Sequence, residues 1–317
     1  MTAHAGTDPL PAPAAQGLPI SLVLGSGAAR GLAHIGVIRV LEAAGYEIRA
    51  IAGSSMGALI GGIYAAGRLA DYESWVRELR EIDVLRLLDI SFTGQAGVLR
   101  GDLVIDTLRK LLGEHRIEDL PMPFTAVATD IEARREVWLD RGSLFDAIRA
   151  SIAIPGVFTP KRIGERLLVD GGLLDPVPIA PTLRNTTALT VAVAITGSPV
   201  RRPLGRAEPP QAAADEGPHD RVETFISNLQ QRLGLHNRKS EPDNQQLSLA
   251  DVVLQSLELI QDSVARFKLA AHPPDVLIEI PTNVCRAHEF YRAAEVIPAG
   301  EHWAWHALER LPACLKP

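Results

Sequence analysis

The sequence predicts an α/β fold in which helices cover both faces of one central sheet. Short apolar runs, typical of buried strands, alternate through most of the chain with stretches whose apolar residues recur at helical spacing. Near the start, residues 20–24 form one such run, which leads through a glycine-rich loop and a helix to a second strand. This order gives a right-handed crossover, so the first two strands are expected to be parallel.

Length and composition agree with a folded enzyme-sized protein. The chain has 317 residues, of which 46% are hydrophobic, enough for a sizeable core in one large or two ordinary domains. The formal net charge of −6 argues against nucleic acid as the main partner. The two cysteines, Cys285 and Cys314, are too few for a disulfide framework or a thiolate metal site. They fit a reducing cytosol, so a cytoplasmic protein without a metal is expected.

The first half of the chain carries its expected elements in close succession. The strand at 20–24 is followed by a helix that ends at Gly45, and the strand at 48–52 by a tightly packed, glycine-rich helix at 56–66. The further elements are a helical region at 71–87, a loop at 91–101, a helix at 103–112, strands at 124–129 and 136–139 around a turn, and a helix at 145–151.

The second half is expected to add strands at 166–169, 188–195 and 276–280. A long amphipathic helix covers 253–267, and two closing helices are predicted at 287–297 and 301–311.

Two segments do not fit this alternation. Residues 1–18 are rich in Ala and Pro and are predicted to be a disordered tail. They lack the basic and apolar regions that a secretory signal requires. Residues 197–246 show no sustained periodicity and are predicted to form a mobile insertion. No window of the sequence reaches the roughly 18 continuous apolar residues of a membrane span.

The stretch from Gly53 to Gly57 carries the first chemical signal. Gly53-Ser54-Ser55-Met56-Gly57 fits the G-x-S-x-G pattern, a strand-to-helix turn sharp enough to expose one serine hydroxyl. By this spacing the exposed serine is Ser55. An ordinary strand–helix turn with Ser55 as the N-cap is the alternative.

The glycine-rich loop at 25–31 has several interpretations. It resembles a dinucleotide fingerprint with Glu47 near the acidic position, but Arg30 stands where that motif requires glycine. A Walker loop is excluded because no Gly-Lys-Ser/Thr follows. The loop amides and the helix N-terminus also suit a developing oxyanion or a phosphate. A purely structural tight turn stays open.

The third signal is Asp170-Gly171-Gly172, which follows a short apolar run. The run delivers an aspartate to the end of a strand. Taken alone, Asp-Gly-Gly more often marks a turn than a catalytic residue.

Together, these three blocks in this order resemble the patatin-like phospholipases, and in particular the bacterial proteins grouped with the esterase domain of neuropathy target esterase. Blocks at 149–156 and 169–178 match as well. The resemblance covers roughly residues 19–311. It implies a three-layer αβα patatin-like fold with a mainly parallel central sheet, in a hydrolase domain at 19–315 that contains the insertion.

The resemblance also implies a serine esterase or lipase that acts on fatty acyl esters of phospholipids or lysophospholipids without a cofactor. Ser55 would attack the ester carbonyl, and Asp170 would accept the serine proton and later help to activate water. The amides of Gly27 and Ala28 would bind the oxyanion. Arg30 would stabilise the loop or face a lipid phosphate. The motif glycines are Gly25, Gly31, Gly53, Gly57, Gly171 and Gly172.

The first block departs from the commoner family pattern, because Ser26 and Ala28 stand where glycines are frequent. Both keep a backbone amide, but neither adopts a positive φ as easily as glycine. With Ser26 and Ala28 in place of glycines, the backbone N–H donors are still available, but the loop can adopt fewer backbone conformations.

Three rival functions are compatible with part of the pattern. A Ser-His-Asp hydrolase would need a late histidine, namely His272, His288, His302 or His306, although none lies in a strand-end loop like that of Asp170. His34 is expected to be packed or solvated. A non-catalytic lipid-binding or regulatory protein on the same scaffold is the second rival, and a nucleotide-binding protein is the third.

A phospholipid substrate implies peripheral, reversible membrane contact, since no span is predicted. Within the insertion, Phe225, Ile226, Leu229 and Leu233 recur at helical spacing beside basic residues. They suit a lid or a lipid-docking helix, although the spacing favours an ordinary surface helix.

Overall fold

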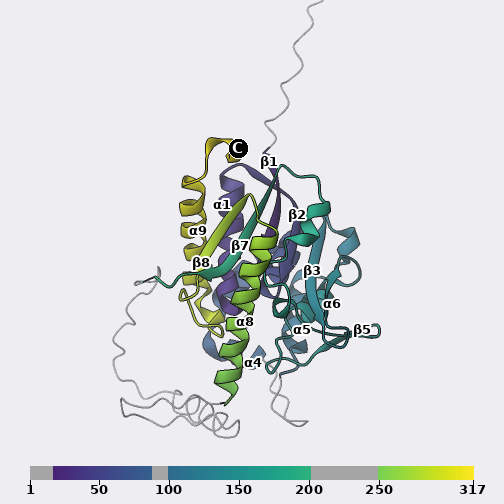
Figure 1. Cartoon of the computed structure of the whole chain (residues 1–317). Helices are drawn as coiled ribbons and strands as arrows, with labels where there is room; N and C mark the ends of the chain where they lie inside the picture. Colours follow the sequence, from purple (N-terminus) through teal and green to yellow (C-terminus); the bar gives the residue numbers. More distant parts are fainter. Residues whose placement is uncertain (1–16, 88–98, 201–248) are drawn as a thin grey trace, which may run out of the picture.

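The computed structural model describes residues 17–87, 99–200 and 249–317, which contain one eight-stranded sheet with helices on both sides (Figure 1). The strand order is β5-β6-β3-β2-β1-β7-β8, and β4 pairs with β3 outside this path. The strands are β1 (Leu18–Leu24), β2 (Tyr46–Ser54), β3 (Phe124–Asp130), β4 (Arg135–Leu139), β5 (Lys161–Ile163), β6 (Arg166–Asp170), β7 (Leu189–Gly197) and β8 (Val276–Pro281).

The sheet is mixed, with parallel strands at its centre. β1 is parallel to β2 and β7, β2 to β3, and β7 to β8. β4, β5 and β6 run antiparallel to the strands they pair with. The parallel pairing predicted for the first two strands is confirmed, and it places Leu24 opposite Gly53. The glycine-rich loop and the G-x-S-x-G turn therefore leave the same edge of the sheet.

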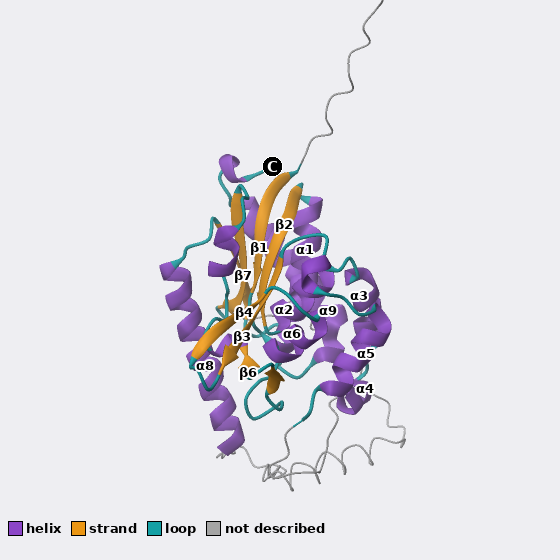
Figure 2. Ribbon diagram, turned by 90° about the vertical axis from the view of Figure 1, so that its right-hand side faces the viewer, coloured by secondary structure: helices purple, strands orange, loops and turns teal. Residues whose placement is uncertain are grey.

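Side chains of the central strands alternate between two helical layers, as the two-residue period of a strand requires. The helices are α1 (Ala33–Ala43), α2 (Met56–Ala65), α3 (Leu69–Glu78), α4 (Glu81–Leu87), α5 (Asp102–Leu112), α6 (Leu144–Ser151), α8 (Leu249–Ala271) and α9 (Ala293–Glu309). In β1, Leu22 and Leu24 join the large core with α1, α2 and α9, whereas Val23 packs in a smaller core with Ala265 of α8. Figure 2 shows α8 on one side of the sheet and α1, α2, α3 and α9 on the other. The predicted layered α/β architecture is confirmed.

Two helical regions differ from the prediction. The region at 71–87 forms two helices, α3 and α4, because Leu79 takes an extended conformation after α3. The two predicted closing helices are one helix, α9, which begins at Ala293 and continues through Pro298.

Close packing on α1 accounts for the continuity of α9. A Cβ atom on Gly36 would overlap the carbonyl oxygen of Ile297, and one on Gly300 would overlap that of Ala33. The two helices thus touch through their glycines, and this contact outweighs the local cost of a proline inside a helix.

Some predictions fall on segments outside the described residues. These are the tail at positions 1–16, most of the loop at 91–101, and the insertion from 201 onwards with its apolar stretch at 225–233. β1 begins at Leu18, so the last residue of the predicted tail belongs to the first strand.

Candidate active site

Ser55 lies in the sharp turn between β2 and α2. Its φ of 54° falls in the left-handed region, which is unusual for a residue with a side chain. The flanking glycines have no room for side chains, since a Cβ on Gly57 would overlap the carbonyl oxygen of Leu24 and one on Gly53 would overlap the backbone of Gly57. The strand, turn and helix thus lie where the G-x-S-x-G motif predicts them.

The Ser55 hydroxyl meets Asp170, which lies 115 residues further along the chain. Ser55 Oγ donates a hydrogen bond of 2.6 Å to Asp170 Oδ2. Both residues are buried, with exposed fractions of 4% and 1%. Ser55 occupies the N-cap position of α2, yet its side chain makes no capping hydrogen bond. The Ser55 hydroxyl therefore donates to the Asp170 carboxylate and does not cap the helix.

Asp170 is the last residue of β6 and is fixed from several sides. Its Oδ1 accepts a hydrogen bond of 2.7 Å from the Gly172 N–H, and its own N–H donates to Ala153 O at 2.9 Å. Burial raises the pKa of Asp170 to about 7, although the hydrogen bonds from Ser55 and Gly172 favour the ionised form. A pKa near neutrality makes this carboxylate a stronger proton acceptor than a free aspartate of pKa about 3.9.

The glycine-rich loop after β1 contains two main-chain N–H groups for which the described residues offer no acceptor. Four neighbouring N–H groups donate to surrounding carbonyls, namely those of Gly25, Ser26, Ala29 and Arg30. Within the part of the chain that the structure describes, the N–H groups of Gly27 and Ala28 have no such acceptor. Ala28 has a φ of 48°. It therefore adopts the positive φ that glycine, the commoner residue at this position in the family pattern, would adopt more easily. These two N–H groups are the predicted oxyanion donors.

The loop adjoins both parts of the Ser55–Asp170 pair. A Cβ on Gly31 would come within 2.5 Å of Met56, the residue after Ser55. On the other side, a Cβ on Gly172 would lie 3.0 Å from Ser26. The donors and the pair therefore share one edge of the sheet.

Arg30 connects this loop to α8 and to the segment after β8. Its side chain donates to Gly27 O at 3.4 Å, to Thr282 O at 3.4 Å and to Glu258 Oε1 of α8 at 2.7 Å. These contacts fit the first of the two predicted roles, stabilisation of the loop. A role toward a lipid phosphate stays a prediction.

A second buried carboxyl group, Asp175, follows the Asp170 turn. Lys268 Nζ of α8 lies 3.5 Å from its Oδ2. Burial raises the pKa of Asp175 above its usual range, Lys268 lowers it, and Glu136 raises it further. The next residue, Pro176, accepts the Ser26 N–H at 2.8 Å. α8 thereby contacts the segment on which the glycine-rich loop rests.

The sequence does not single out Ser151, whose side chain accepts a hydrogen bond from the main chain of Ser55. The Ser55 N–H donates to Ser151 Oγ at 2.9 Å, and the Ser151 hydroxyl donates to Val127 O at 2.6 Å. Ser151 is fully buried at the end of α6. The block at 149–156 contains this serine, but its pattern alone does not reveal a contact with residue 55.

Histidines stand apart from the Ser55–Asp170 pair in the described part of the chain, where no imidazole forms a hydrogen bond with either residue. His34 is fully buried, with Nε2 at 2.8 Å from Gly25 O. Burial lowers the pKa of His34 to about 4, so it is neutral and supports the loop. His302 and His306 stack with each other on α9.

The described residues contain no group of three or more His, Cys, Asp or Glu side chains that could hold a metal ion. Among the helices described, none combines the length and apolar character needed to cross a membrane.

Comparison with known proteins agrees with the geometry of the site. A family model described as patatin-like phospholipase matches residues 22–183, which include Ser55 and Asp170. An uncharacterized NTE family protein of Mycobacterium tuberculosis is 41% identical over 330 residues, covering 92% of this chain and 91% of the relative. Patatin-like phospholipase domain-containing protein 6 of Mus musculus is 33% identical over 190 residues, covering 57% of this chain and 14% of that protein.

Among solved structures, VipD from Legionella pneumophila matches with a TM-score of 0.51, covering 93% of this chain and 67% of that one. At 15% sequence identity this likeness concerns the fold alone. The family match and the near full-length relative lead to one conclusion: the chain belongs to the patatin-like phospholipase family, a family of hydrolases.

Proposed function

We propose that this protein is a serine esterase or lipase that hydrolyses fatty acyl esters of phospholipids or lysophospholipids through a Ser55–Asp170 dyad. The observation that carries the proposal is the 2.6 Å hydrogen bond from Ser55 Oγ to Asp170 Oδ2 in a buried site. The N–H groups of Gly27 and Ala28 on the adjoining loop, which have no acceptor among the residues that the structure describes, support it.

In the acylation step, Ser55 Oγ attacks the ester carbonyl carbon while its proton moves to Asp170 Oδ2. The carbonyl oxygen becomes an oxyanion, which the amides of Gly27 and Ala28 bind. Collapse of this intermediate expels the alcohol, which takes the proton from Asp170. The products of the step are the free alcohol and an acyl ester of Ser55.

In the deacylation step, Asp170 accepts a proton from a water molecule that attacks the acyl ester. The same N–H groups bind the second oxyanion. When it collapses, Ser55 Oγ leaves and regains a proton from Asp170, and the fatty acid is released. One carboxyl group thus serves as base and acid in turn, which suits a pKa of about 7.

A lipid substrate lies at a water–lipid interface, so the proposed enzyme meets it by peripheral, reversible contact from the cytoplasm. The family to which the chain belongs supports the lipid class of this substrate.

The direct test is hydrolysis of p-nitrophenyl butyrate and of a lysophospholipid by wild type and Ser55→Ala. Wild type is expected to cleave both esters, and the variant neither. A long-chain fluorophosphonate is expected to label wild type on Ser55 and to leave Ser55→Ala unlabelled. Folded wild type that neither cleaves the esters nor reacts with the fluorophosphonate would instead support a non-catalytic lipid-binding protein.

A further inference from the structure

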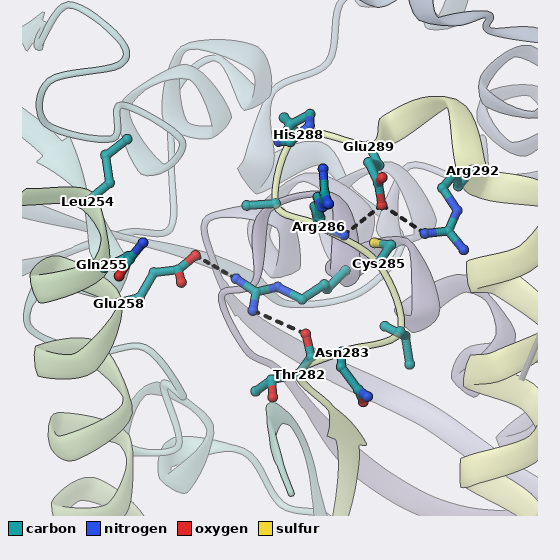
Figure 3. Close-up of a pocket in the computed structure, with 13 residues that line it drawn as sticks. Leu254, Gln255, Glu258, Thr282, Asn283, Cys285, Arg286, His288, Glu289 and Arg292 are labelled. Carbon is teal, nitrogen blue, oxygen red and sulfur yellow. Dashed lines mark hydrogen bonds and ion pairs between the residues drawn. The ribbon is translucent and has the colours of Figure 1, made fainter. Parts of the chain in front are cut away.

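A cavity of about 690 Å³ lies between α8 and the segment that follows β8 (Figure 3). Leu254 and Glu258 of α8 face the segment from Thr282 onwards across this space. A smaller pocket of about 40 Å³ touches Ser26 and Gly27 of the glycine-rich loop, and Arg30 and Glu258 border both spaces. The cavity adjoins the loop that carries the predicted oxyanion donors, because the N–H of Ala29 in that loop donates to Ala287 O of the cavity lining at 3.0 Å.

The two carboxylates in the cavity lining are both paired with arginine. Glu258 accepts from Arg30 at 2.7 Å, and Glu289 accepts from Arg292 at 2.8 Å. Cys285 adds no negative charge, because burial raises the pKa of its thiol to about 12. Both acidic groups of the lining thus have an arginine partner other than Arg286, and Arg292 also pairs with Glu295, which lies outside the lining, at 2.7 Å.

The third arginine of the lining is Arg286. Its main-chain N–H donates to Glu289 Oε2 at 2.8 Å, which Figure 3 draws as a dashed line between the two residues. Its exposed guanidinium lies within ion-pair distance of no carboxylate in the part of the chain that the structure describes. A guanidinium presents five N–H donors in a planar fork that matches the oxygens of a phosphate.

We propose that this cavity is a head-group site that binds the phosphate of the acyl-ester substrate, with Arg286 as its principal ligand. The inference rests on the proposed function, which places the ester carbonyl at Gly27 and Ala28. A glycerophosphate ester carries its phosphate a few bonds from its acyl carbonyl. We infer that such a molecule reaches from the oxyanion donors to Arg286, because the segment that carries Arg286 is hydrogen-bonded to the donor loop through Ala29 N–H and Ala287 O, at 3.0 Å.

The kinetic test compares two single-chain esters of equal acyl length, a 1-acylglycerol 3-phosphate and the corresponding 1-acylglycerol, both below their aggregation concentrations. Arg286→Gln removes a charge-assisted hydrogen bond to phosphate, so the ratio of kcat/KM for the phosphorylated over the neutral ester should fall on the order of tenfold to a hundredfold. Arg286→Lys keeps the charge without the fork and should restore part of the ratio. Arg310→Gln, an equal change of charge at the exposed end of α9, should leave the ratio at the wild-type value.

A binding test separates this site from the chemistry. Full-length Ser55→Ala, which cannot turn over substrate, is titrated with glycerol 3-phosphate and with inorganic phosphate, alone and combined with Arg286→Gln. Arg286→Gln should raise the dissociation constant of glycerol 3-phosphate about tenfold or more. If wild type fails to cleave any ester, this titration still decides the head-group site.

Two outcomes would overturn the head-group site. An unchanged substrate ratio in Arg286→Gln, with wild type active on both esters, would show that Arg286 does not bind the phosphate of the substrate. If inorganic phosphate binds in a way that depends on Arg286 and glycerol 3-phosphate does not, the cavity is a site for a free anion and not for the head group.

Discussion

Replacement of Ser151 by alanine tests how the turn at Ser55, the proposed nucleophile, is held in place. The change removes the acceptor of the Ser55 N–H and the donor to Val127 O, both inside the protein. Each buried group left without a partner costs about 1–3 kcal/mol, so the loss of both partners in Ser151→Ala should destabilise the fold by about 2–6 kcal/mol. The melting temperature should fall accordingly by several degrees.

The same substitution should slow catalysis. Ser55 is held at a φ of 54°, a conformation whose strain costs on the order of 1–3 kcal/mol in a residue with a side chain. Without the Ser151 bond, the turn can relax and move Oγ away from the oxyanion donors. Because 1.36 kcal/mol corresponds to a tenfold change in rate, kcat should fall about tenfold or more while KM changes little.

The assay is steady-state hydrolysis of p-nitrophenyl butyrate at a temperature where each variant is folded, with thermal unfolding followed in parallel. Ser74→Ala is the matched control, because the Ser74 hydroxyl donates to Ala70 O on the exposed surface of α3. It should keep the wild-type kcat and melting temperature. A Ser151→Ala variant with both values unchanged would refute the reasoning.

Three further predictions concern pH, the loop and the turn. Asp170 must be ionised to accept a proton, and its pKa is raised to about 7, so kcat/KM should fall as the pH drops below about 7 and level off above it. The control variant Asp175→Asn should keep the midpoint of this pH profile. A midpoint near 4 in wild type would contradict the role of burial. Ala28→Gly should retain activity and change stability by no more than about 1 kcal/mol in thermal unfolding, since glycine accepts the φ of 48° without strain, whereas Ala28→Val should lose activity. Gly57→Ala should destabilise the protein by about 1–3 kcal/mol or prevent folding, because its Cβ would overlap Leu24 O; a variant as stable as wild type would show that the turn has room to spare.

The sequence was informative where the backbone must pass close to itself. Gly53 and Gly57 are required by contacts around the turn, so glycine leaves a visible pattern around Ser55. A Cβ atom on Gly171 would likewise overlap Val127 O, which explains why glycine follows Asp170. The pair Ser55–Asp170 could therefore be predicted from two short motifs and their order along the chain.

Other features depend on contacts between distant residues and leave no local pattern. Ser151 looks like any small residue at the end of a helix until α6 is packed beside β3. The continuity of α9 through Pro298 depends on glycine contacts with α1 that the local sequence does not specify. The cavity around Arg286 combines residues from α8 and the segment after β8, whose proximity only the fold establishes.

The central claim is that Asp170, and not a histidine, takes the proton of Ser55. The most direct measurement is kcat/KM for p-nitrophenyl butyrate in Asp170→Asn and in single replacements of His272, His288, His302 and His306 by glutamine, each checked for folding by circular dichroism. We expect Asp170→Asn to lose activity by a factor of at least about 10³, and each histidine variant to stay within about threefold of wild type. A folded histidine variant without activity, together with an active Asp170→Asn, would contradict the dyad.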